Sequence, residues 1–202
     1  MSTPTLLAHS ADVALIAALS GAASLLPIPF VDDKIRTHLH AQMFRTLAAR
    51  KGKSLDNDAV AVLLGKEKRS LLGAAGKFAI LYPVKRIFRR IFGVLALNDA
   101  ASEVSKTYHL GFLFMTALSD DADETHSMGE IRAAIDATLT AVDTRPVRHL
   151  FQGAVRAWSR SRTKDDSIDA SHLLGRLKKY GNKHFEGAAT ILRDTLTQEA
   201  GS

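Results

Sequence analysis

The sequence predicts an all-α protein, a single bundle of about eight helices with a central apolar helix. Three observations favour this class. Apolar residues recur three and four positions apart along most of the chain, which is the spacing of one helix face. No stretch of useful length alternates apolar and polar residues as a half-buried strand would. Alanine and leucine are abundant, whereas the chain has only three tyrosines and one tryptophan.

Length and composition place the chain among globular proteins. Its 202 residues suit a single core, and we expect a flexible start at 1–10 followed by one domain over 11–200. Hydrophobic residues make up 46% and charged residues 24%, which argues against disorder throughout. The absence of cysteine excludes a disulfide scaffold and a thiolate zinc site, and it is compatible with a cytoplasmic location.

The first predicted helix covers residues 12–26 and is apolar nearly all round, so we expect it near the centre of the core. Residues 13–31 carry no charge, and that length would cross a bilayer. The run is nevertheless rich in alanine, serine and glycine, and Pro27 and Pro29 interrupt it. The sequence therefore predicts a buried helix followed by an extended connector at 27–30.

A second helix is predicted to begin at an aspartate cap at 32–33 and to run to about Arg50. The basic last turn suits the negative end of the helix, and Gly52 is expected to stop it. A turn at 54–58 then leads to a short helix over 59–64.

Polar breaks separate the helices predicted in the second half of the chain. Asn98 and Asp99 are expected to cap or kink the helix, and the acidic stretch at 119–127 is expected to form a solvated loop. The proline within 144–146 marks a further break. Helices are predicted at 100–118, near the centre, and at 128–142, 147–161, 170–180 and 184–198.

The stretch from Lys77 to Leu97, KFAILYPVKRIFRRIFGVLAL, has the strongest pattern in the sequence. Its apolar residues from Val84 onward fall on one helix face, with four cations between them, and Pro83 suits a helix start. A basic amphipathic helix is therefore predicted at about 83–97. Its candidate binding residues are Lys77, Lys85, Arg86, Phe88, Arg89, Arg90 and Phe92.

This helix predicts a non-enzymatic protein that attaches peripherally to an anionic membrane surface. Apolar side chains would insert, and each cation would contribute roughly 1 kcal/mol near acidic lipid. One alternative is a soluble adaptor on which the same helix docks an acidic protein partner. Nucleic-acid binding is a third and weaker hypothesis. The side chains beside the cations are mainly aliphatic, whereas base recognition usually needs polar side chains and exposed aromatic rings there. An ordinary bundle helix with solvated or paired arginines would have the same pattern.

The net charge of +6 is unevenly distributed along the chain. Residues 66–90 hold eight basic residues and one acidic residue, whereas residues 119–143 hold seven acidic residues and one arginine. The two blocks nearly cancel, so they could face one another. A basic surface of this kind indicates an anionic partner.

The sequence contains no convincing catalytic or ligand-binding motif, so no enzyme activity, cofactor, metal or small-molecule substrate is predicted. The segment around Gly65 lacks the upstream glycine of a phosphate-binding loop. His38 and His40 diverge on a helix and cannot share a metal ion. The acidic residues at 120–124 lack the glycine and closing glutamate of a calcium loop. His109, on an apolar helix, is expected to be packed. The oligomeric state has no indicator in the sequence.

Three segments resemble a known family: PIPFVDD at 27–33, MFRTLAARKG at 43–52 and AAIDATLTAVDTRPVRHLF at 133–151. They are similar to EcsC-like helical proteins and to the related uncharacterised domain attached to some bacterial GTPases. Phe30 stands where a glycine is common in that family. The resemblance implies a membrane-associated helical module without known chemistry, and it brings no catalytic residues. We accordingly expect a cytoplasmic protein, peripheral on the inner membrane.

Overall fold

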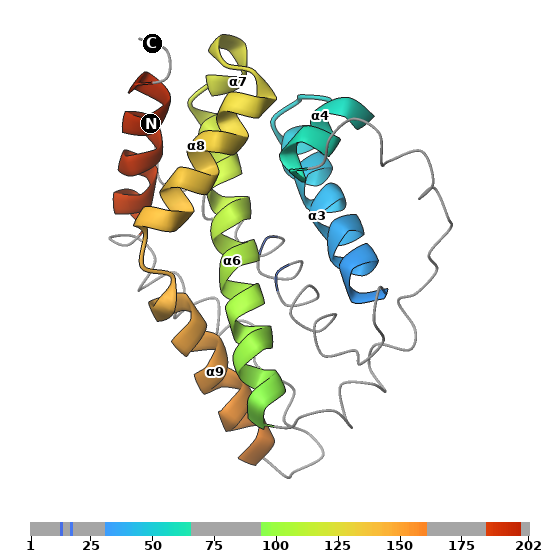
Figure 1. The fold of residues 1–202 in the computed structure, drawn as a ribbon, viewed down its shortest axis with the longest axis vertical. Helices are drawn as coiled ribbons and strands as arrows, with labels where there is room; N and C mark the ends of the chain where they lie inside the picture. The colour runs from blue at the N-terminus through green and yellow to red at the C-terminus, as the bar shows by residue number, and fades with distance from the viewer. Residues whose placement is uncertain (1–12, 14–16, 18–30, 66–93, 161–184, 199–202) are drawn as a thin grey trace.

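The computed structural model describes residues 13, 17, 31–65, 94–160 and 185–198 (Figure 1). These residues are mostly helical and include no strand, which confirms the all-α class. The predicted connector at 27–30, the predicted helix at 170–180 and most of those at 12–26 and 83–97 lie outside the described residues. The described helices are α3 (Val31–Arg50), α4 (Asn57–Leu63), α6 (Val94–Ser119), α7 (Ala122–Thr125), α8 (Met128–Ala141), α9 (Arg145–Arg160) and an unlabelled helix at 185–198.

Residues at the ends of the two helices explain where α3 ends and where α4 begins. Gly52 has φ +71°, in the left-handed region that favours glycine, and the predicted stop there is confirmed. Asp56 caps α4 by accepting a hydrogen bond of 2.7 Å from the Ala59 backbone N–H, so α4 begins two residues before the predicted 59–64. The aspartate cap predicted at 32–33 is wrong, because α3 already includes both residues. Aspartates suit the positive first turn of a helix as well as its cap.

Helix α6 is the element against which α3, α7, α8 and α9 pack (Figure 1). Its 26 residues span about 39 Å. It continues unbroken through Asn98 and Asp99, so the cap predicted there is wrong, and the alternative of a kink stays a prediction. These two residues disfavour a helix interior by less than about 1 kcal/mol each. The burial of Ala100 and Ala101 directly after them helps to stabilise the helix against that cost.

Helices α8 and α9 also begin at local signals. Ser127 and Glu130 form a capping box at the start of α8, in which each side chain accepts a hydrogen bond from the other's backbone N–H. The helix predicted at 128–142 is thus confirmed almost to the residue. Helix α9 begins at Arg145, two residues before the prediction, because Pro146 fits the first turn of a helix, where its missing N–H has no partner to lose. The helix at 185–198 agrees with the predicted 184–198.

The core lies where α6 meets α3, α8, α9 and the 185–198 helix. Phe44 and Phe114, both fully buried, meet edge to face with ring centroids 4.9 Å apart. His109 is also fully buried, and its Nδ1 donates to the Ser105 carbonyl at 2.7 Å, which confirms the expectation that it is packed. Other buried members are Met43, Leu47, Leu63, Leu113, Met115, Leu118, Ile131, Ile135 and Leu192.

Gly111 marks a close approach on α6. A Cβ atom there would lie 2.7 Å from Val13 Cγ1 and 2.9 Å from Met43 Sδ. Val13 and Ala17 are helical and almost completely buried, as predicted for the first helix, although the residues around them lie outside the described set. The missing side chain of Gly111 therefore makes room for Val13 against α6.

Replacing Gly111 by alanine should lower the free energy of unfolding by about 1–2 kcal/mol. Overpacking costs about 1–3 kcal/mol, and the better helix propensity of alanine offsets up to about 1 kcal/mol of that. Gly153→Ala in α9 is the matched control, because Gly153 is exposed and has nothing within 4 Å of the added Cβ. Urea titrations should show the control slightly stabilised. A Gly111→Ala protein as stable as the wild type would contradict the tight contact.

Candidate functional site

The candidate binding residues from the basic stretch lie outside the described residues. Of that stretch the structure describes only residues 94–97, which form the first turn of α6. The undescribed candidates are Lys77, Lys85, Arg86, Phe88, Arg89, Arg90 and Phe92.

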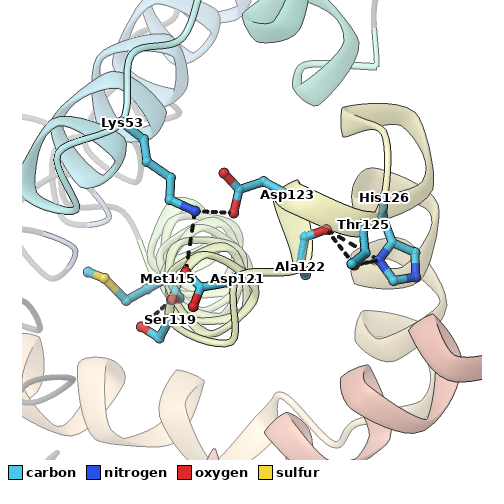
Figure 2. A network of polar contacts seen from close by, with 8 residues as sticks. All are labelled: Lys53, Met115, Ser119, Asp121, Ala122, Asp123, Thr125 and His126. Atoms are coloured by element: carbon cyan, nitrogen blue, oxygen red, sulfur yellow. Dashed lines mark hydrogen bonds and ion pairs between the residues drawn. The ribbon is translucent and has the colours of Figure 1, made fainter.

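The acidic stretch lies at the opposite end of α6 and is more ordered than predicted. Residues Ala122–Thr125 form the short helix α7, so the predicted loop is wrong over these residues, although Asp120, Asp121 and Glu124 are exposed as expected of a solvated stretch. In Figure 2, Lys53 extends from the segment after α3 towards Asp121 and Asp123. Its Nζ donates to Asp123 Oδ1 at 2.6 Å and to Asp121 Oδ1 at 3.4 Å, and the hydrogen bond to Asp123 raises the pKa of Lys53.

Two further contacts tie the same stretch to the 185–198 helix. Arg193 Nε and Nη2 donate to the two carboxylate oxygens of Asp120 at 2.7 and 3.3 Å. His126 Nε2 donates to the Leu196 carbonyl at 3.1 Å. The acidic stretch thus contacts two segments that each lie about 70 residues from it along the chain, and several of its carboxylates have cationic partners within the bundle.

The acidic stretch is also far from the point where the basic stretch joins α6. Val94 and Ser119 are the two ends of one helix and lie about 37 Å apart. Charges on the surface are screened over about 8 Å at physiological ionic strength. The suggestion that the two blocks face one another stays a prediction, because the basic block at 66–90 lies outside the described residues.

A polar group lies between α3 and α6 that the sequence analysis did not find. His40 Nε2 lies 3.0 Å from Thr107 Oγ1 and 4.0 Å from a carboxylate oxygen of Glu103, whose other oxygen lies 3.5 Å from Arg36. Burial lowers the pKa of His40 to about 4, and the charges of Arg132 and Arg36 act in the same direction. At neutral pH His40 is therefore uncharged. A contact between residues 67 positions apart leaves no local signal in the sequence.

This polar group has the features of a packed interface rather than a metal centre. Among the residues that the structure describes, no three His, Cys, Asp or Glu side chains gather as metal ligands. Two potential ligands, His40 and Glu103, are already engaged with Thr107 and Arg36. The arrangement holds α3 on α6 through a hydrogen bond and an ion pair.

Helix α9 is rich in arginine, a feature that the sequence analysis did not single out. Val147 and Phe151 are buried on the side that packs on α6, whereas Arg145 and His149 are exposed. The helix contains four arginines and no acidic residue. This composition over 16 residues could have been noticed in the sequence. The Lys77–Leu97 stretch was chosen because cations and large apolar residues alternate more densely there.

Comparisons of the chain with protein-family models, with curated proteins and with solved structures find no match. The resemblance to EcsC-like proteins therefore stays a prediction. Within the described ranges, none of the helices is long and apolar enough to span a bilayer.

Proposed function

We propose that the protein attaches peripherally to an anionic membrane surface through the basic amphipathic stretch at 77–97. The observation that carries this proposal is the interleaving of four cations with four large apolar residues over eight positions. Peripheral attachment needs both cationic attraction and apolar insertion, because either of them alone binds a membrane only marginally. The paired residues are Lys85, Arg86, Arg89 and Arg90 with Ile87, Phe88, Ile91 and Phe92.

The described helices support the proposal through the placement of the acidic residues. The stretch joins α6 at Val94, whereas Asp120 to Asp123 lie beyond its other end and are paired with Lys53 and Arg193. Those carboxylates therefore already have cationic partners within the described part of the bundle. An anionic surface outside the molecule is the partner that the charge of the basic stretch favours.

The test is vesicle flotation with phosphatidylserine-containing and pure phosphatidylcholine vesicles. The wild type should float with the anionic vesicles at low salt and be released as salt rises. Changing all four cations (K85Q/R86Q/R89Q/R90Q) should weaken binding by about fivefold per charge, on the order of 500-fold together. A thermal melt of each protein shows that it is folded.

A second variant, F88S/F92S, separates lipid binding from core packing. If these phenylalanines insert into lipid, the variant keeps the wild-type melting temperature and binds vesicles poorly. If they are core residues, it loses several kcal/mol of stability. A wild-type protein that never floats with anionic vesicles at low salt would overturn the proposal. Binding of an acidic peptide in the same experiment would then favour the adaptor alternative.

A further inference from the structure

One side of α3 carries a row of exposed, mostly polar and basic side chains along most of its length. The members of this row are Lys34, His38, Gln42, Arg45 and Ala49, and all of them are exposed. At about 100° per residue the five positions fall within a sector about 80° wide, and they extend over about 22 Å of the helix axis. They are called the α3 row below.

The opposite side of α3 belongs to the core, so the α3 row is turned outwards. Met43, Phe44 and Leu47 are buried, and α3 packs on α6 and α4. In Figure 1, α3 lies at the edge of the described helices, with α6 between it and α9. The row is therefore accessible to a partner that approaches from outside the molecule.

The α3 row is positively charged, and its two cations are not neutralised by the described residues. The helix contains no acidic residue from position 34 to its end. Among the described residues, no carboxylate forms an ion pair with Lys34 or Arg45. Arg45 Nη2 donates to the side-chain oxygen of Asn57 at 2.8 Å, but this amide carries no charge. Two cations about 17 Å apart along the helix thus keep their charge available for an anionic partner.

Duplex DNA is the anionic partner whose chemistry fits the α3 row. B-DNA presents closely spaced phosphates, which lysine and arginine neutralise, and its major groove is wide enough to admit an α-helix. Glutamine and arginine side chains form paired hydrogen bonds with base edges in that groove. A membrane fits less well, because the row has no large apolar side chain to insert and charge alone binds a membrane only marginally.

We propose that the α3 row binds duplex DNA, with Lys34 and Arg45 in contact with phosphates. This binding goes beyond the membrane attachment proposed above, and it uses a different helix. Nucleic acid is the weaker hypothesis for the stretch at 77–97, because the side chains beside its cations are mainly aliphatic. The α3 row instead places His38 and Gln42 beside its cations.

The experiment measures how the affinity for a fluorescein-labelled, mixed-sequence DNA duplex of about two helical turns depends on salt. Each lost phosphate contact lowers the slope of log affinity against log salt by about 0.9. We therefore expect K34Q/R45Q to lose about 1.8 from the slope and to bind about 30-fold more weakly at physiological salt. K34R/R45K keeps both charges and should bind within about twofold of the wild type.

R145Q/R193Q is the matched control for net charge. It removes the same charge from two exposed arginines that already pair with aspartates at 2.8 and 2.7 Å. Because the charge of these arginines is balanced locally, the control should keep the wild-type slope and bind within about twofold of the wild type. A thermal melt of each protein shows that it is folded.

Each other outcome contradicts the proposal. A wild-type slope in K34Q/R45Q means that the row does not contact phosphates, and equal losses in R145Q/R193Q mean a response to net charge alone. Loss of DNA binding only in K85Q/R86Q/R89Q/R90Q places the binding on the stretch at 77–97. If K34Q/R45Q loses binding to phosphatidylserine-containing vesicles but not to DNA, the row binds lipid headgroups instead. A wild type that does not bind the duplex overturns the proposal and leaves membrane attachment to the flotation test.

Discussion

Phe114→Ala is expected to lower the free energy of unfolding by about 3–5 kcal/mol. The Phe114 ring is fully buried in α6 and meets the fully buried Phe44 of α3 edge to face at 4.9 Å. Truncation removes the transfer free energy of the ring and leaves a cavity between helices that cannot fully collapse. Chemical denaturation followed by circular dichroism measures the loss.

A double-mutant cycle shows how much of that loss belongs to the ring pair. Phe44→Ala, Phe114→Ala and the double variant should give a coupling energy of about 0.5–1.5 kcal/mol. Phe112→Ala is the control on the same helix, since Phe112 is only partly buried and should cost less than Phe114. Equal losses at positions 112 and 114 would contradict the placement of Phe114 at the centre of the core.

Acid should destabilise the protein through His40, by roughly 3 kcal/mol between pH 7 and pH 4. The pKa of His40 is about 4 in the folded protein, against 6.5 for an ordinary histidine. Between these two values the unfolded chain takes up a proton that the folded chain does not, so stability is fully present above pH 6.5 and falls towards pH 4. Each pKa unit corresponds to 1.36 kcal/mol.

His40→Gln isolates this contribution from the titration of the carboxylates. A glutamine can keep a hydrogen bond to Thr107 but takes up no proton. The difference in unfolding free energy between wild type and variant should therefore shift by roughly 3 kcal/mol in favour of the variant on going from pH 7 to pH 4. His38→Gln, at an exposed position of the same helix, is the matched control. If the unfolding free energies of wild type and H40Q change in parallel with pH, protonation of His40 does not destabilise the contact between α3 and α6.

The elements that the sequence predicted well are those with a local cause. Gly52 ends α3 because its backbone conformation favours glycine, and Pro146 starts α9 because a first turn tolerates its missing N–H. The predictions were wrong where tertiary contacts overrode the local preference of the residues. Asn98 and Asp99 are weak helix formers, yet α6 passes through them. The acidic stretch was expected to be a loop, yet α7 forms within it, and Lys53 and Arg193 pair with its carboxylates.

The candidate site was predictable only in part. The composition of the 77–97 stretch indicates an anionic partner, and that inference needs no coordinates. The arginine content of α9 was also visible in the sequence, but the sequence does not say which side of this helix packs on α6. The buried positions of Val147 and Phe151 answer that question, and periodicity alone does not.

By itself, the sequence determined the all-α class, the ends of several helices and the separation of basic and acidic blocks. These follow from interactions within a few residues, in which periodicity, caps and backbone preferences act locally. Only the tertiary structure decided that the acidic stretch lies about 37 Å from the start of α6. It also decided that His40 meets Thr107 and Glu103, and that Gly111 makes room for Val13. Such contacts join residues far apart in the chain, and their energy comes from the packing of whole helices, which no short stretch of sequence specifies.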